Sequence, residues 1–304
     1  MSENKLRKEP VCLNCGQTVE DRFCSSCGQE NTEVRQTFGY LFSHFFKDLT
    51  HYDSSFWKTL KSLLFKPGKL TQSYLEGKRK AFVNPIRLYI FISFITFFLF
   101  AALSQKDTFS FNLKGNSNSG IYIQEANMEV NSVHQLDSLQ STQAKQPNVI
   151  YKVYRKMLEV GGSKNFAKAF ISGFYHNIPK TLFIYLPIFA FFLWLFHNKK
   201  KWWYFDHGIF TLHYFSYLLL AATIYLLVKN ITHTLNINWL FVVTSIISFT
   251  ILIYSFLYFF IAHHRVYKTT KTNSILKGSL LFLINAFLLI ILTIALLLFT
   301  FFTL

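Results

Sequence analysis

Four cysteines near the amino terminus are the residues whose type and spacing predict chemistry most clearly. They form two CxxC pairs separated by eight residues, and a glycine that suits a tight turn follows each pair. Each pair can hold a metal ion with two thiolates, so the four together predict a closed, structural Zn²⁺ site. Two disulfides are the alternative, and these persist mainly in oxidising compartments. The predicted zinc ligands are Cys12, Cys15, Cys24 and Cys27.

Long apolar runs behind these cysteines predict a membrane protein. The sequence is 51% hydrophobic and 19% aromatic, and it contains uncharged stretches of about 20 residues, enough to cross a ~30 Å hydrocarbon core. The expected fold class is an all-α polytopic membrane protein with about five transmembrane helices, a small N-terminal zinc ribbon and cytoplasmic amphipathic helices. The expected spans are residues 85–103, 178–196, 208–228, 237–262 and 275–302.

Basic residues in the short loops predict how these spans are oriented. A lysine triplet at 199–201 lies between the second and third spans, and Arg265, Lys268, Lys271 and Lys277 lie between the last two. By the positive-inside rule the N-terminus is cytoplasmic and the C-terminus extracytoplasmic. Residues 1–37 show no cleavable signal peptide, so the first span is expected to direct insertion. A cytoplasmic cysteine module would stay reduced, which favours zinc over disulfides.

Changes in composition divide the chain into five expected segments. Helical spacing of apolar residues over 38–65 predicts two amphipathic helices, which either lie flat at the headgroups or pack on the transmembrane bundle. The segments are a basic leader with the zinc ribbon at 1–37, cytoplasmic amphipathic and juxtamembrane helices at 38–84, the first transmembrane helix at 85–103, an extracytoplasmic loop with interfacial helices at 104–177, and a four-helix transmembrane region at 178–304.

The net charge of +16 is concentrated beside the spans. This position indicates anionic membrane lipids as partners, and no nucleic-acid partner is expected because no nucleic-acid-binding motif accompanies the charge. The basic residues at the start of the first span either bind lipid phosphates or only fix the topology. These candidate lipid- or phosphate-binding residues are Lys78, Arg79, Lys80 and Arg87.

Few polar residues lie inside the spans, and the absence of carboxylates from their centres argues against a coupled transporter. His213 and Asn285 define a possible intramembrane polar site, although such residues more often serve as hydrogen-bond partners between helices. His207, His263 and His264 stand at cytoplasmic ends of spans and make a weaker candidate for a metal-dependent enzyme. No HExxH, nucleophile elbow or Walker loop occurs in the sequence.

The stretch FKPGKLTQSYLEGKRKAFVNPIRLYIFIS at 65–93, together with the double CxxC, resembles an uncharacterised bacterial family known as a domain of unknown function. Its members combine an N-terminal ribbon, a PG…Y…GKR…P.R.Y segment and a multi-span region. The resemblance implies a multi-pass protein of the bacterial inner membrane and brings no known activity. Besides the four cysteines, the matching residues are Pro67, Gly68, Tyr74, Gly77, Lys78, Arg79, Pro85, Arg87 and Tyr89.

These observations predict a non-enzymatic scaffold or sensor that recruits an unidentified cytoplasmic protein through a structural zinc ribbon. The alternative is a transporter or lipid-handling protein with a cavity among spans two to five. The sequence leaves enzymatic activity open, and the missing catalytic signatures weigh against it.

Overall fold

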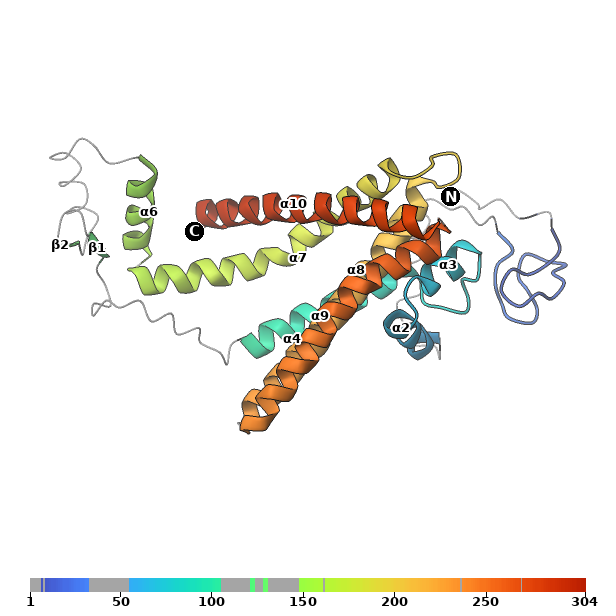
Figure 1. The fold of residues 1–304 in the computed structure, drawn as a ribbon, viewed down its shortest axis with the longest axis horizontal. Coiled ribbons are helices and arrows are strands. Elements are labelled where there is room, and N and C mark those ends of the chain that lie inside the picture. The colour runs from blue at the N-terminus through green and yellow to red at the C-terminus, as the bar shows by residue number, and fades with distance from the viewer. Residues whose placement is uncertain are drawn as a thin grey trace. The chain divides into compact units, whose positions relative to one another are not determined.

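The computed structural model describes residue 7 and residues 9–32, 55–104, 121–123, 128–130, 148–160, 162–235, 237–268 and 270–304. The first of the two predicted amphipathic helices falls within residues 33–54, outside this described part. In chain order the elements in Figure 1 are α2 (Ser55–Phe65), α3 (Lys69–Leu75), α4 (Pro85–Ser104), β1 (Ile121–Ile123), β2 (Met128–Val130), α6 (Asn148–Glu159), α7 (Ser163–Leu195), α8 (Tyr204–Leu235), α9 (Asn238–Tyr267) and α10 (Lys271–Thr303).

Among the residues that the structure describes, five helices are long and apolar enough to cross a membrane, as the sequence predicts. Their length and composition are those of a multi-pass membrane protein. The spans are Pro85–Leu103, Asn165–Leu195, Tyr204–Leu235, Trp239–Tyr267 and Thr272–Thr303.

Helix α7 is longer than the span expected from the sequence. It is one helix of 33 residues that begins at Ser163, so it includes residues expected to form a separate interfacial helix. At 1.5 Å per residue it extends about 50 Å, well beyond a ~30 Å hydrocarbon core. The apolar run sets where a span can lie, whereas the helix continues for as long as its backbone hydrogen bonds are made.

Local sequence explains where two of the spanning helices begin. Helix α4 starts at Pro85, whose missing N–H costs nothing in a first turn, and Asn84 Oδ1 accepts a hydrogen bond from the Ile86 amide at 3.0 Å. At the start of α8, Asp206 Oδ2 accepts from the Trp203 amide at 2.9 Å. These caps satisfy N–H groups that have no partner within the helix.

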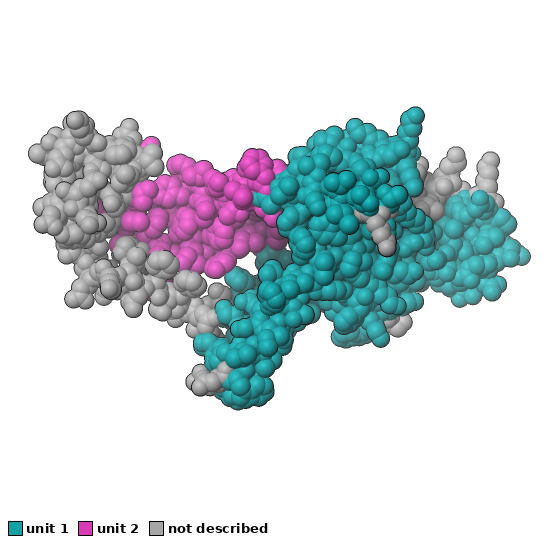
Figure 2. Space-filling view, in the orientation of Figure 1, with its two compact units in different colours: residues 1–106, 183–286 teal, residues 107–182, 287–304 magenta. Residues whose placement is uncertain are grey.

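The chain divides into two units, coloured separately in Figure 2, of which the first comprises residues 1–106 and 183–286. In this unit α4 and α9 both pack against α8. The Thr96 and Thr223 hydroxyls hydrogen-bond between α4 and α8 at 2.7 Å. Between α8 and α9, the rings of Tyr217 and Tyr258 stack at 3.6 Å. Hydroxyl pairs and aromatic stacking replace the hydrophobic effect, which gives no drive between helices in lipid.

The second unit comprises residues 107–182 and 287–304. Lys156 of α6 donates to the Phe301 carbonyl of α10 at 2.5 Å, and Phe166 of α7 packs edge-on against the Phe301 ring. Strands β1 and β2 pair antiparallel over three residues. This short pair is a departure from the all-α expectation, within the described residues, and the rest of the fold class is helical as predicted.

Helices α2 and α3 form a hairpin that packs on α9. Tyr254 and Tyr258 of α9 donate hydrogen bonds to the carbonyls of Leu64 and Leu63, at 2.7 and 3.0 Å. Arg265 donates to the carbonyl of Pro67 in the turn. These contacts occupy the last carbonyls of α2, which have no partner within their own helix. Of the two arrangements that the sequence allows, α2 therefore adopts the one packed on the bundle.

The turn of this hairpin requires a glycine at position 68. Gly68 has φ +73°, and an added Cβ would lie 2.8 Å from the carbonyl oxygen of Ala262 in α9. A side chain would therefore meet an unfavourable backbone conformation and also a neighbouring main chain, which cannot easily move aside.

We expect Gly68→Ala to lower the thermal unfolding midpoint of the detergent-solubilised chain, because left-handed backbone costs a non-glycine residue about 1–3 kcal/mol and the overlap with Ala262 adds to that. Gly28→Ala is the matched control, since Gly28 has φ +70° but no atom within 4 Å of its added Cβ. Equal effects of the two substitutions would contradict the packing of the hairpin on α9.

Candidate metal centre

The two CxxC pairs fold into two knuckles of the same construction. In the first, the Cys12 amide donates to the Gln17 carbonyl and the Gly16 amide to the Cys12 carbonyl; in the second, Cys24 bonds to Gln29 and Gly28 to Cys24 in the same way. The φ angles of Gly16 and Gly28 are +80° and +70°. The glycines thus have the positive φ that the sequence predicts for the knuckle turns.

All four thiols converge between the knuckles. Their Sγ atoms lie within 4.8 Å of one another, and two pairs, Cys12 with Cys27 and Cys15 with Cys24, are each 3.6 Å apart. Four sulfurs at 2.3 Å from a tetrahedral Zn²⁺ ion would be about 3.8 Å apart. The cysteines are free thiols, and the four can hold a metal ion. Within the described ranges, no other group of three or more Cys, His, Asp or Glu already has its ligand atoms gathered in this way.

The thiols differ in acidity because their surroundings differ. Backbone N–H groups, first that of Cys27 and also that of Ser26, lower the pKa of Cys24 to about 7. At Cys15 a backbone hydrogen bond from Gln17 acts in the same direction, but desolvation and the neighbouring thiols outweigh it and raise the pKa to about 11. Four thiolates this close together repel one another, and a bound cation removes that cost.

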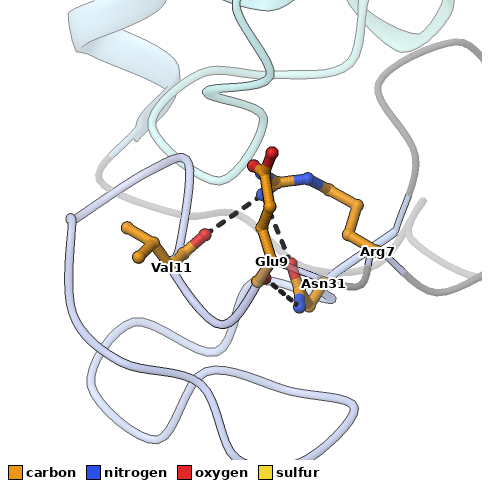
Figure 3. A network of polar contacts seen from close by, with 4 residues as sticks. All are labelled: Arg7, Glu9, Val11 and Asn31. Carbon is orange, nitrogen blue, oxygen red and sulfur yellow. Dashed lines mark hydrogen bonds and ion pairs between the residues drawn. The ribbon is translucent and has the colours of Figure 1, made fainter.

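Polar contacts close the ribbon, residues 9–32, where its two ends meet (Figure 3). Arg7 donates to the carbonyl of Val11 at 3.1 Å and to Asn31 Oδ1 at 3.4 Å, and it pairs with the carboxylate of Glu9. Asn31 in turn donates to the carbonyl of Glu9 at 3.2 Å. The segment that enters the ribbon is therefore bonded to the segment that leaves it.

The ribbon docks on the linker between α3 and α4, residues 76–84. The Gln29 side chain donates to the Gly77 carbonyl at 2.9 Å and accepts from the amides of Arg79 and Lys80, at 3.1 and 3.2 Å. A Cβ added at Gly77 would lie 2.4 Å from the Leu13 side chain, so the glycine permits close approach of the ribbon. One glutamine therefore bonds to three main-chain groups of the linker.

Helix α2 holds the other end of the same linker. The buried hydroxyl of Thr59 accepts a hydrogen bond from the Val83 amide at 3.0 Å and donates to the Ser55 carbonyl at 2.7 Å. The linker that leads into the first span is thus fixed at one end by the ribbon and at the other by α2.

The candidate phosphate-binding cations lie on or beside this linker with different surroundings. Lys78 pairs with Glu76 at 3.3 Å; desolvation acts to raise the pKa of Glu76, but hydrogen bonds from Gln72 and Lys78 leave it lowered. Arg79 lies 5.3 Å from the centre of the Tyr74 ring. Lys80 is exposed, and Arg87 is half-buried in the first turn of α4.

His213 and Asn285, predicted as one possible site, have separate partners. His213 Nδ1 hydrogen-bonds with Thr71 Oγ1 of α3 at 3.0 Å. Asn285 Oδ1 accepts from the Tyr185 hydroxyl of α7 at 2.8 Å. Each residue therefore makes a hydrogen bond between helices, and the two are not joined to each other by these bonds.

The histidines at the span ends are grouped differently from the expectation. His207 and His263 lie near each other, but the third member of the group is His197 and not His264. His197 Nε2 is 3.1 Å from His263 Nε2, and its ring centroid is 5.2 Å from that of His207. Burial lowers the pKa of His197 to about 4. No pattern in the sequence signalled His197, because no other metal-ligating residue stands near it in the chain after the end of α7.

Comparison with known families finds one match. Residues 53–97 are similar to a family described as a protein of unknown function, DUF3667. This region contains α2, α3, the linker and most of α4, and it overlaps the segment whose motif resembles an uncharacterised family. No curated protein and no solved structure matches the chain.

We expect Gln29→Ala to free the linker from the ribbon, because it removes all three side-chain hydrogen bonds. Trypsin should then cleave after Lys78, Arg79 or Lys80 several-fold faster in the folded protein, as followed by mass spectrometry of the fragments. Gln17→Ala is the matched control, since Gln17 holds the same position in the first knuckle. Equal cleavage rates in the two variants would contradict docking through Gln29.

Proposed function

We propose that this chain is a non-enzymatic scaffold or sensor of the bacterial inner membrane, with a structural zinc ribbon on the cytoplasmic side that recruits a protein partner. Cys12, Cys15, Cys24 and Cys27 hold Zn²⁺ as four thiolates, and no coordination position is left for a substrate. The metal stabilises a module that is too small to bury a core of its own. The role of the ribbon is therefore docking and not catalysis.

The contact between Gln29 and the linker is the observation that carries this proposal. A ribbon used only as an independent binding module needs no fixed contact with the membrane segments. Here Gln29 bonds to Gly77, Arg79 and Lys80, next to the start of α4. A partner that pulls on or rotates the ribbon would act on the entry to the first span, which is the behaviour of a sensor.

The basic residues of the linker fit a location at a membrane surface. Exposed lysine near a span is attracted to anionic headgroups by about 1 kcal/mol per charge. Lys80 and the lysine triplet at 199–201 supply such charges. We assign them to anionic lipids, which would hold the linker at the surface where the ribbon meets its partner.

The ribbon's metal and its recruiting role are tested together by Cys12→Ser combined with Cys15→Ser. We expect the purified full chain to contain one equivalent of zinc and the double variant to lose it, because two thiolates cannot complete a tetrahedral site. In cells, crosslinks from the ribbon to a cytoplasmic protein should disappear, while the amount of protein in the membrane stays unchanged. Ser25→Ala, within the second knuckle, should retain both metal and crosslinks.

Absence of stoichiometric zinc from the wild-type chain would contradict the metal assignment. If the double variant loses zinc but keeps the crosslinks, the metal assignment stands and the recruiting role is contradicted.

The orientation can be tested with the native cysteines, because all four lie in the ribbon. After chelation of the metal, a membrane-impermeant thiol reagent should label the chain in inverted vesicles and leave it unlabelled in right-side-out vesicles. The reverse pattern would remove the cytoplasmic placement, and with it the argument that the thiols stay reduced.

A further inference from the structure

Three buried histidines from three different parts of the first unit gather at one end of its spans. His197 follows α7, His207 lies in the first turn of α8, and His263 lies in the last turns of α9. Their exposed fractions are 6%, 0% and 0%. The ring of His197 is central, with centroids 5.2 Å from His207 and 5.1 Å from His263. Each buried imidazole has two ring nitrogens that need partners, so three of them side by side require a physical explanation.

Each of these histidines has its Nδ1 atom bonded to an oxygen. His197 Nδ1 bonds to the carbonyl of Leu193 at 2.7 Å, and His263 Nδ1 to the Ser274 hydroxyl at 2.9 Å. His207 Nδ1 bonds to the Tyr267 hydroxyl at 2.7 Å. In metal-binding histidines one ring nitrogen donates its N–H to an oxygen and the other nitrogen binds the ion. The Leu193 carbonyl accepts such a bond, and the Ser274 and Tyr267 hydroxyls are able to accept one.

The Nε2 atoms are the ones left for a ligand. A carbonyl only accepts, so His197 Nδ1 carries the proton and, in the neutral ring, its Nε2 carries a lone pair. That lone pair faces His263 Nε2 at 3.1 Å. His207 Nε2 is buried and has no hydrogen-bond partner among the residues that the structure describes.

Without a metal, one hydrogen bond joins the Nε2 atoms of His197 and His263. His263 Nε2–H donates to His197 Nε2, and the Ser274 hydroxyl donates to His263 Nδ1. Because a serine hydroxyl also accepts, His263 can move its proton to Nδ1 and turn a second Nε2 lone pair towards the gap. Two imidazole nitrogens bound to one tetrahedral ion lie about 3.4 Å apart, so the pair needs to open by only a few tenths of an ångström.

We propose that His197, His263 and His207 form a second metal site, for a divalent late transition-metal ion such as Zn²⁺, separate from the cysteine site. Neutral imidazoles select such ions over Mg²⁺ and Ca²⁺, which prefer oxygen. His207 Nε2 has not yet converged with the other two nitrogens, since only the four cysteines form a gathered ligand group in the described ranges. His207 therefore turns towards the pair when the ion binds.

The positive charge of Lys277 opposes the binding of a cation at this site. Lys277 acts on both His197 and His263 through its positive charge. A cation in the site would feel the same repulsion. Lys277→Gln should therefore tighten metal binding several-fold, whereas a purely structural histidine cluster would bind no metal with either residue at position 277.

The test uses the full chain in detergent with all four cysteines replaced by serine, so that the thiolate site is gone. Titration with Zn²⁺ or Co²⁺ should still find one equivalent bound, and X-ray absorption should report nitrogen and oxygen ligands without sulfur. Adding His197→Ala and His263→Ala should abolish binding, and His207→Gln should weaken it at least tenfold. His264→Ala is the matched control, since His264 lies next to His263 but outside the group, and it should bind as before.

No bound metal in the folded cysteine-free chain would overturn the second site, as would binding that survives loss of His197 and His263. Circular dichroism establishes that each variant is folded. If the histidine double variant does not fold, the sulfur-free absorption spectrum and the effect of Lys277→Gln decide the question in the chain with all its histidines. The cysteine site and its proposed function are tested separately, by the zinc content and the crosslinks of the chain that retains its cysteines.

Discussion

The carbonyl oxygens at the end of α2 set the constraint on which the described membrane-proximal structure depends. A helix leaves its last carbonyls without partners, and in an apolar environment each such group costs several kcal/mol. Tyr254 and Tyr258 of α9 supply the missing donors to Leu64 and Leu63. Once α2 is seated on α9, Thr59 can hold the amide of Val83, and the linker is positioned for the ribbon. The path from the span to the metal centre is a series of hydrogen bonds to main-chain groups.

Main-chain contacts of this kind explain why the ribbon and the membrane segments can be coupled without a large interface. Each neutral hydrogen bond contributes only about 0.5–1.5 kcal/mol net, so the clamp formed by Gln29 is modest. The contact is also geometrically specific, because the Gln29 side chain hydrogen-bonds to one carbonyl and two amides of the same linker. A weak and specific contact suits an equilibrium that the proposed partner would shift by binding.

Local sequence patterns predicted the features that depend on neighbouring residues. The four cysteines form a site because each knuckle closes within six residues, and the five long helices follow from uninterrupted apolar runs. Contacts between distant residues left no pattern. Gln29 meets Gly77 across 48 positions, and His197 meets His263 across 66. The packing of α2 was undecided, because an apolar face suits both a lipid surface and a protein one until the tyrosines of α9 are placed.

The duplicated construction of the ribbon leaves it with two corresponding corners, one at Gln17 and one at Gln29, and only the second grips the linker. Gln29 bonds to the linker of its own chain, and Gln17 closes its knuckle with the same main-chain hydrogen bond. Under the proposed recruiting role, the Gln17 corner is the one left for the partner. Such a module can join two surfaces while keeping a fixed spacing between them. That spacing equals the width of the ribbon, because no flexible linker separates its two knuckles.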